Sequence, residues 1–391
     1  MTRRLPRRPR PRSLTDDRRS LPYSSLRRVT RIAPSPSPSI ARLLADFDAR
    51  RPAALARAVS IVENQRDGFD ALLASLHPRI GRARRIGITG PPGAGKSTLT
   101  TQLTLAYREA GLTVGIVAVD PTSPFTGGAL LGDRIRMESV ALDPGVFIRS
   151  LATRGSLGGL SSSTRVVADV LDAFGFDRIL LETVGVGQSE LDIARSAEST
   201  LVVLVPESGD SIQALKAGLM EIGDLFAVNK ADRPGADRVR NDIELMLGMR
   251  AGRGLQDAPA HHGVDLGRIG NPARAAREAA RGEQEERWVP PVLRTVAAKG
   301  EGIAELVDAL DRHFRYLGTS GELTRRRRAR WREQIIEVAE QRLRRRVWQD
   351  AGVQAFIDSV LPAVEDGSRT PFGIADELLG RAADILTRTA T

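Results

Sequence analysis

Short apolar runs alternate with helical patterns through the central part of the chain. The runs are rich in Val, Ile and Leu, as is typical of strands buried on both faces. We expect strands at 85–89, 114–119, 146–149, 178–182, 200–205, 225–228 and 293–296. Apolar residues at helical spacing predict helices at 97–110, 160–174, 236–248 and 302–316. This alternation predicts an α/β fold with a doubly wound, mainly parallel sheet, whose ligands bind at the carboxyl ends of the strands.

Both flanks of this region, which we place at 85–317, are predicted to be helical. In the segment 40–84, Pro52 is expected to open a helix and Gly68 to end it. In the segment 318–391, arginines crowd an apolar stripe, which consists of Ile335, Ile336, Ala339, Leu343 and Val347. The arginines fit a solvated face paired with glutamates, or an arm that covers its stripe with a second subunit.

The first 39 residues are rich in Arg, Pro and Ser and carry most of the net charge of +10. They hold eleven Arg and two Asp, so their net charge is 11 − 2 = +9, and only 10 − 9 = +1 is left for the rest. We expect this tail to be disordered, because it has too little apolar surface to offset its ordering entropy. The folded part is nearly neutral, which argues against a nucleic-acid partner.

The composition also limits the location and the chemistry. The 391 residues include no Cys, which excludes disulfides, thiol catalysis and zinc fingers, and four scattered His argue against a nickel site. No apolar run approaches the roughly 20 residues that span a bilayer, and the N-terminus lacks a secretory h-region. We therefore expect a cytoplasmic protein without a membrane segment. Residues 250–290, rich in Gly, Ala and Arg, are expected to form an inserted surface loop.

The pattern G-x-x-x-x-G-K-S stands between the first expected strand and the first expected helix. In that setting it is the phosphate-binding P-loop, whose glycines let backbone N–H groups surround an anion. Lys96 is expected to reach the β- and γ-phosphates as a catalytic residue, and Ser97 to bind Mg²⁺. The predicted nucleotide-binding residues here are Gly90, Pro91, Pro92, Gly93, Ala94, Gly95, Lys96, Ser97 and Thr98.

A second motif, N-K-x-D, follows the strand expected at 225–228 and comprises Asn229, Lys230 and Asp232. The Asp232 carboxylate can accept hydrogen bonds from N1–H and the 2-amino group of guanine, and adenine offers neither donor. Lys230 would cover the base with its aliphatic stem. After the last strand, small residues let backbone N–H groups approach the guanine carbonyl; they belong to Ala297, Ala298 and Lys299. The motif predicts GTP and GDP as ligands.

Acidic residues end two of the expected strands on the nucleotide side. Asp120 ends the second strand and Glu182 the fourth, and Asp133 follows in the loop between. We expect the three carboxylates to converge on Mg²⁺ and the γ-phosphate, to which Gly185 offers its N–H. The next position holds Val186, where Ras-type proteins have the Gln that positions the attacking water, so slow intrinsic hydrolysis is predicted.

Together these segments resemble the MeaB/ArgK-type methylmalonyl-CoA mutase-associated GTPases, from about residue 40 to the C-terminal helices. The resemblance rests on 90–97, 119–123, 127–133, 153–159, 182–190 and 229–232. It implies a homodimeric P-loop GTPase of the class that includes signal-recognition and nickel-chaperone GTPases. Such a protein uses Mg²⁺ and escorts an adenosylcobalamin-dependent acyl-CoA mutase, whose cofactor loading it gates and which it protects. The resemblance also implies that the C-terminal helices are a dimerisation arm.

The resemblance further implies a third switch loop at 206–216, with Gln213 and Lys216 as its catalytic residues. The family usually reads D-E-L-Q-G-I-K where this chain has D-S-I-Q-A-L-K. Two alternative functions are an ATPase or kinase of an amino-acid transport system, which is the family's older label, and a nickel-type metallochaperone. The N-K-x-D motif argues against the first, and the lack of Cys argues against the second.

Overall fold

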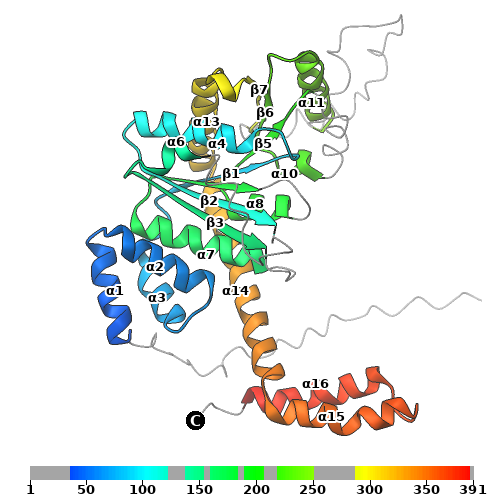
Figure 1. Cartoon of the computed structure of the whole chain (residues 1–391). Helices are drawn as coiled ribbons and strands as arrows, with labels where there is room; N and C mark the ends of the chain where they lie inside the picture. Colours follow the sequence, from blue (N-terminus) through cyan, green and yellow to red (C-terminus); the bar gives the residue numbers. More distant parts are fainter. Residues whose placement is uncertain are drawn as a thin grey trace, which may run out of the picture.

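The computed structural model describes residues 36–121, 137–153, 159–183, 189–206, 218–250 and 287–387. Within these ranges, one seven-stranded sheet has the order β3-β2-β4-β1-β5-β6-β7 (Figure 1). Its strands are β1 (Arg84–Thr89), β2 (Val114–Pro121), β3 (Val146–Thr153), β4 (Arg178–Thr183), β5 (Ser199–Leu204), β6 (Leu225–Asn229) and β7 (Val292–Thr295). All neighbouring strands are parallel, so the predicted doubly wound α/β fold is confirmed.

Helices cover both faces of the sheet, because successive strand residues point to opposite sides. In β4, Leu180 faces one hydrophobic cluster, and Ile179 and Leu181 face the other. The first cluster is covered by α4 (Lys96–Glu109), α6 (Glu138–Ala141) and α13 (Ile303–Thr319). The opposite face is covered by α7 (Gly159–Phe174), α8 (Ser189–Ser196), α10 (Met220–Ile222) and α11 (Ala236–Arg250). The four predicted helices correspond to α4, α7, α11 and α13.

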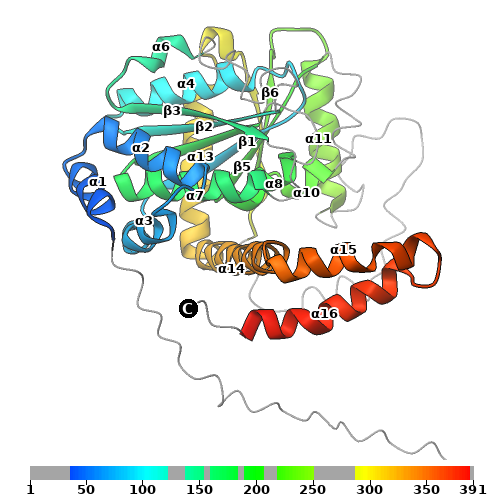
Figure 2. The same ribbon diagram turned by 60° about the horizontal axis from the view of Figure 1, so that its bottom comes forward.

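Three helices before the sheet pack on α7 and extend the core (Figure 2). They are α1 (Pro38–Asp48), α2 (Pro52–Glu63) and α3 (Phe69–Leu76), followed by the turn η2 (His77–Arg79). Pro52 opens α2 as expected, but Gly68 does not end it. Gly68 instead precedes α3 with a φ of +87°, a backbone conformation that favours glycine. Because α1 begins at Pro38, the last two residues of the expected tail are helical; residues 1–35 lie outside the described residues.

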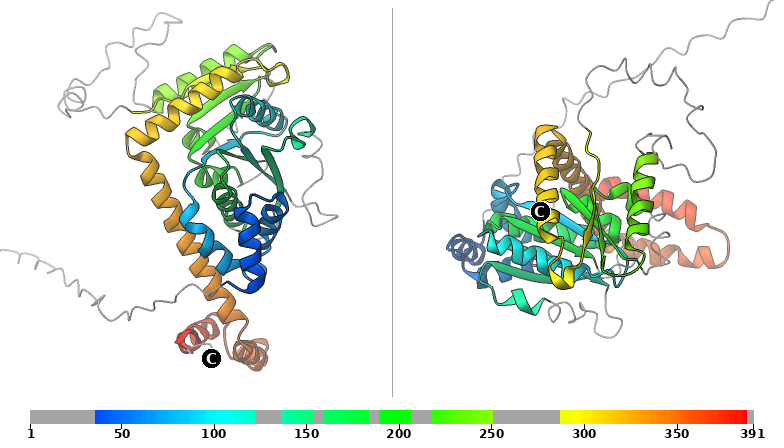
Figure 3. Two further views of the ribbon diagram at one scale, coloured as in Figure 1. Left: turned by 90° about the vertical axis from the view of Figure 1, so that its left-hand side faces the viewer. Right: turned by 90° about the horizontal axis from the view of Figure 1, so that it is seen from above.

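Three helices after the sheet form an extension that reaches away from the domain (Figure 3). They are α14 (Glu322–Trp348), α15 (Ala351–Glu365) and α16 (Pro371–Thr387), which we call the arm. The apolar stripe expected on α14 is partly exposed, and Ile335 has 70% of its surface accessible. Phe372 and Leu379 on α16 are also exposed. None of the helices that the structure describes is both long and apolar enough to cross a membrane.

Arg325 is exposed and pairs with Glu322 of the same helix, as on the expected solvated face, but three other early arginines of α14 contact the domain. Arg326 donates from both terminal nitrogens to the carboxylate of Asp224, at 2.8 Å each. Arg327 donates to Glu198 at 2.9 Å, and Arg330 lies 3.5 Å from the same carboxylate. Both acids precede strands at the amino-terminal edge of the sheet. The arginines therefore fasten the arm to the domain from the side opposite the P-loop.

Candidate nucleotide-binding site

The P-loop turns closely against its neighbours between β1 and α4. Gly90 has a φ of +141°, and a Cβ there would lie 2.1 Å from the carbonyl oxygen of Val203 in β5. Gly95 has a φ of +85°, and its Cβ would lie 2.4 Å from Nδ2 of Asn229. No larger residue fits at either position without moving backbone or the Asn229 amide. The loop therefore turns tightly, and α4 begins directly after it at Lys96, so that a helix N-terminus, which favours an anion, lies at this edge.

Lys96 is buried and lies across the P-loop. Its Nζ donates to the carbonyl oxygens of Gly90 at 2.8 Å and Pro91 at 3.0 Å. The first turn of α4 thus holds the Lys96 ammonium group beside the loop that the sequence assigns to phosphate binding. The remaining predicted loop residues lie along the same edge; Ala94 is buried, Ser97 is partly buried, and Pro92, Gly93 and Thr98 are exposed.

Glu182 lies beside Ser97 at the carboxyl end of β4. The strand register pairs Glu182 with Ile88 of β1 and Ala118 of β2, so this residue lies between the P-loop strand and the strand that carries Asp120. The Ser97 hydroxyl donates to the Glu182 carboxylate at 2.5 Å. Glu182 is almost fully buried. Two residues that the sequence assigns to Mg²⁺ binding therefore lie side by side.

Several predicted site residues cannot be placed. Asp120 belongs to β2, which ends beside β4, but its side chain is outside the described set. Four further residues lie outside the described residues: Asp133, Gly185, Gln213 and Lys216. Their roles stay predictions.

The residues around Ser97 have the chemistry that Mg²⁺ requires. A hydroxyl and a carboxylate are hard oxygen donors, and Mg²⁺ is usually held by one or two carboxylates together with phosphate oxygens and water. Ser97 and Glu182 supply such donors within hydrogen-bonding distance of each other. Among the described residues, no group of three His, Cys, Asp or Glu side chains gathers as an all-protein metal site. The donors fit an ion that is shared with a bound phosphate.

Asn229 joins three segments of the site. Its Nδ2 donates to the carbonyl oxygen of Ala94 in the P-loop at 2.8 Å. Its Oδ1 accepts from the backbone N–H of Ala297 at 3.0 Å and from the hydroxyl of Thr295 at 3.2 Å. The amide thus fixes the end of β6 against the P-loop and against the turn η6 (Ala297–Lys299) that follows β7. The phosphate and guanine motifs therefore form one site.

Asp232 and Lys299 meet at the outer side of this edge. Lys299 Nζ lies 3.3 Å from Oδ2 of Asp232, and both side chains are about half exposed. Lys230 has a φ of +55°, an uncommon conformation for a residue with a side chain. It turns the chain between Asn229 and Asp232. Ala298 is exposed in the adjacent turn. The residues predicted to read guanine therefore lie together, next to the P-loop.

The sequence interpretation assigned no role to two residues that hold the guanine side of the site. Thr295 donates to Asn229, and Arg294 donates to the carbonyl oxygen of Ala231 at 3.0 Å. Arg294 also forms an ion pair of 2.7 Å with Asp237 at the start of α11. Their position directly before the small residues of η6 was the only signal in the sequence.

A second polar constellation, made of Ser199, His313 and Asp224, lies at the opposite edge of the sheet. His313 Nδ1 is 2.8 Å from the Ser199 hydroxyl, and Nε2 is 3.4 Å from Asp224. This order resembles a hydrolytic triad, but His313 is 0% and Ser199 2% exposed, so no substrate reaches the hydroxyl. Burial alone would raise the pKa of Asp224, yet hydrogen bonds from Arg326 and His313 lower it to about 2. The group is structural.

Known proteins resemble this chain over most of its length. A GTPase of Pyrococcus horikoshii is 42% identical over 326 residues, which cover 83% of this chain and 93% of that protein. GTPase ArgK of Escherichia coli K12 is 32% identical over 323 residues, which cover 82% of this chain and 89% of that protein. The mitochondrial methylmalonic aciduria type A homolog of Mus musculus is 31% identical over 304 residues, covering 78% and 65%.

A solved structure and a family description agree with the fold. The crystal structure of a LAO/AO transport system kinase matches 88% of this chain and 97% of that chain, with a TM-score of 0.57 and 24% identity, which supports the fold alone. The family model "Methylmalonyl Co-A mutase-associated GTPase MeaB" matches residues 55–352. Guanine-nucleotide binding follows from membership of this GTPase family. The chain belongs to the MeaB family of methylmalonyl-CoA mutase-associated GTPases.

Proposed function

We propose that this protein hydrolyses GTP and uses the cycle to control cofactor loading and protection of an adenosylcobalamin-dependent acyl-CoA mutase, such as methylmalonyl-CoA mutase. The observation that carries the proposal is the joint made by Asn229. One amide holds the P-loop and the guanine segment together, with Asp232 at the outer edge. This arrangement supports a GTP site, and the family name supplies the partner class.

The proposed reaction is the attack of water on the γ-phosphate, which yields GDP and inorganic phosphate. Lys96 binds the β- and γ-phosphates. Asp232 selects guanine by accepting hydrogen bonds from the two donors of the base, N1–H and the 2-amino group. Ser97 and Glu182, with Asp120 and Asp133, would hold Mg²⁺, whose charge balances the phosphate oxygens when it is bound. Gly185 would donate its N–H to the γ-phosphate, and the predicted contributions of Gln213 and Lys216 come from the loop after β5.

The proposed assembly is a homodimer that binds the mutase. Exposed apolar side chains of the arm support the dimer, because Ile335, Phe372 and Leu379 would lose their contact with water in it. The relatives' names support the mutase, since one is a methylmalonic aciduria type A homolog and the family is described as mutase-associated. Hydrolysis within this assembly would set when the mutase receives or keeps its cofactor.

Affinity capture from the native cell tests the proposal. Tagged protein is loaded either with GDP or with a non-hydrolysable GTP analogue, and its bound partners are identified. We expect an adenosylcobalamin-dependent acyl-CoA mutase, in amounts that differ between the two nucleotides. Hydrolysis assays with GTP and ATP run in parallel. Equal use of the two nucleotides would contradict the GTPase assignment, and capture without any such mutase would contradict the chaperone role.

A further inference from the structure

The arm helix α14 is bound to the domain by two sets of polar contacts that differ in burial. The first set runs from Arg326 to Glu337 and involves Glu198 and Arg165, each only 1% exposed. The second lies further along the helix and is exposed. Breaking a buried pair leaves a desolvated charge without compensation, whereas an exposed pair is readily replaced by water. The two sets therefore constrain α14 to different degrees.

Glu198 connects α8 to α14. It stands between the end of α8 and the start of β5, and its carboxylate accepts from the backbone N–H of Arg85 in β1 at 2.9 Å. Its other oxygen accepts from Arg327 at 2.9 Å and lies 3.5 Å from Arg330. Its backbone carbonyl accepts from Arg326 at 2.7 Å. Three arginines of α14 thus hold one residue at the end of α8.

Arg165 connects α7 to the same helix further along. Its guanidinium donates to Glu337 at 2.5 Å and lies 3.5 Å from Glu333. Asp192 of α8 belongs to this group electrostatically: burial raises its pKa, Arg165 lowers it and Glu333 raises it. Arg165 therefore joins α7 directly to α14, and Glu198 makes the corresponding connection at the end of α8.

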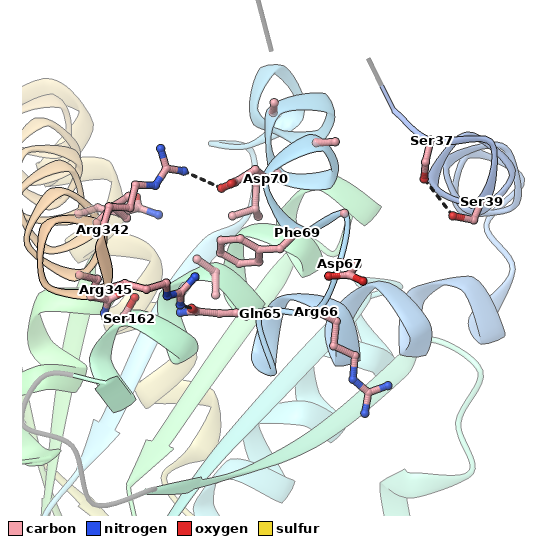
Figure 4. A pocket seen from close by; sticks show the side chains of 18 residues that line it. Ser37, Ser39, Gln65, Arg66, Asp67, Phe69, Asp70, Ser162, Arg342 and Arg345 are labelled. Atoms are coloured by element: carbon pink, nitrogen blue, oxygen red, sulfur yellow. Dashed lines mark hydrogen bonds and ion pairs between the residues drawn. The ribbon is translucent and has the colours of Figure 1, made fainter. Parts of the chain in front are cut away.

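The second set spans a cavity under the middle of α14. Arg342 pairs with Asp70 of α3 at 2.6 Å, and both side chains are at least 60% exposed; Arg345 donates to Gln65 at 2.8 Å (Figure 4). The cavity beneath has a volume of about 900 Å³ and lies between α3, α7 and α14. Beyond the buried cluster, α14 is therefore loosely packed against the domain.

The chain order links the buried cluster to the nucleotide edge. At its amino end, α7 follows β3 after residues 154–158, and α8 follows β4 after residues 184–188. Both strands end at the edge that carries Ser97 and Glu182. Each helix thus begins on the side of the proposed phosphate site, and each leads to a buried charge that contacts the arm.

We propose that Arg165 and Glu198 are positioning residues that transmit the nucleotide state to the arm: they make α14 follow α7 and α8 when GTP replaces GDP. This inference rests on the proposed function, because it needs a GTP-dependent cycle. The buried pairs move as one unit, and the exposed pairs of Arg342 and Arg345 break and re-form over the cavity. The orientation of α15 and α16 then differs between the two nucleotide states.

The absence of cysteine makes a distance measurement direct. Spin labels are placed on the full chain with Glu109→Cys at the exposed end of α4 and Asp358→Cys on the exposed face of α15. Pulsed electron–electron double resonance then gives the distribution of distances between the two spin labels, with GDP and with a non-hydrolysable GTP analogue. Labelled protein is diluted with unlabelled protein, so that distances within one chain dominate. We expect two populations whose ratio depends on the nucleotide.

The variants separate transmission from simple packing. Arg165→Gln and Glu337→Gln should each change the population ratio in the GTP-analogue state roughly two- to thirtyfold, the range expected for residues that carry coupling. Arg165→Lys should restore most of the response, because it keeps the charge. Glu198→Gln tests the second connection. The matched control is Arg342→Gln, which removes an exposed pair between α14 and α3 and should leave the nucleotide response in place.

Two results would overturn the inference. One is a parent protein whose distance distribution is the same with both nucleotides; the other is a response that survives in Arg165→Gln, Glu337→Gln and Glu198→Gln. Nucleotide affinity is measured on the same samples with fluorescent GTP and ATP. If GTP is preferred but the arm does not respond, the inference fails and the proposed function stands. If GTP is not preferred, the proposed function itself fails.

Discussion

Asn229 shows why one residue type is required at the centre of the site. Its amide donates to the carbonyl of Ala94 and accepts from the N–H of Ala297, and both contacts are buried. A carboxylate of the same shape would lose the donor and place a charge against a carbonyl oxygen. In the proposed function the neighbouring Asp232 has the opposite requirement, since its two acceptor oxygens would meet the two donors of guanine. Replacing Asn229 would therefore disturb the contact between the P-loop and the guanine segment, whereas replacing Asp232 would change which base is bound.

Asp232→Asn should weaken GTP binding and favour xanthosine triphosphate, whose 2-oxo group accepts from the new amide. Sites built to hydrogen-bond a group reject analogues without it by roughly 10⁴–10⁵, and we expect the wild type to prefer GTP over ATP on that scale. Competition binding with the three nucleotides measures this. Asp237→Asn, which changes an exposed carboxylate paired with Arg294, is the control and should keep the GTP preference.

Lys96→Ala should remove phosphate affinity without unfolding the domain. The amine has no apolar packing role and contacts two carbonyl oxygens of the loop. Hydrogen bonds to charged groups contribute about 1.5–3 kcal/mol each, so we expect GTP binding to weaken roughly 10- to 100-fold or more. Binding and thermal unfolding are measured together. Normal turnover in this variant would show that the P-loop is not the active site.

At the scale of elements, hydrophobic periodicity located the sheet well. All seven strands fall where apolar runs predicted them, because buried parallel strands are apolar on both faces. The edge strand β3 extends to Thr153, beyond the predicted end, because residues 150–153 continue the parallel pairing with β2. The short helix α8 was not predicted, because its eight residues complete only about two turns, too few to show a helical period. Periodicity therefore finds long buried elements and misses short ones.

The partners of the α14 arginines could not be predicted from the sequence. Arg326 and Asp224 are 102 residues apart, and Arg327 and Glu198 are 129 apart. A single sequence shows local spacing, which suggested glutamates on the same helix as the partners. The actual pairs exist only because the sheet order brings β5 and β6 under the arm. The P-loop and guanine motifs were predictable because each is local in sequence.

The pairing of Arg326 with Asp224 should make stability fall at low pH. The folded pKa of Asp224 is about 2, below its usual 3.8, so the ionised form is favoured by folding. This stabilisation is fully present above pH 3.8 and is lost as the pH falls through 2, and it amounts to about 2 kcal/mol. Urea unfolding between about pH 5 and pH 2 measures it.

Asp224→Asn should remove that part of the pH dependence and lower stability at neutral pH, because Arg326 loses its ionised partner. Asp358→Asn on the exposed face of α15 is the control and should leave the profile unchanged. A wild-type profile that is flat over this pH range would show that Asp224 is not held in its ionised form.

At the scale of the molecule, the described structure begins at residue 36, just before the first helix. Ser37 caps α1 by accepting from the N–H of Ile40, and Ile40 is buried. Deleting residues 1–35 should therefore leave the melting temperature and GTP hydrolysis nearly unchanged, whereas deletion through residue 40 removes the cap and a core side chain. Thermal unfolding of both truncations decides this. A large loss in the shorter deletion would make the tail part of the fold.

Partner-dependent hydrolysis is the property that involves the whole assembly. Unassisted GTPases turn over at about 10⁻⁴ to 10⁻² per second, and a well-placed extra group adds roughly 10³–10⁵. We expect slow hydrolysis alone and faster hydrolysis with the mutase. Lys216→Ala should keep GTP affinity and the basal rate within a few-fold but lose most of the stimulation, and Gln213→Ala should lose less, because it removes a neutral contact.

Single-turnover hydrolysis with and without saturating mutase tests this expectation. Full stimulation in Lys216→Ala would exclude the loop after β5 from the mechanism. No stimulation of the wild type would exclude the mutase as the activating partner. A conservative Lys216→Arg variant, which keeps the positive charge, serves as the matched control and should retain part of the stimulation.

The distance in sequence between the arm's arginines and their acids also affects how the protein is made. Ribosomes deliver Glu198 and Asp224 more than a hundred residues before Arg327 and Arg326, respectively. At about 5–20 residues per second, the emerging chain spends roughly 5–25 s without the arginines that pair with these two carboxylates. During that time the carboxylates have the backbone N–H groups of Arg85 and Thr200 as partners within the sheet. We expect the amino-terminal edge of the sheet to gain its full charge compensation only when α14 leaves the ribosome.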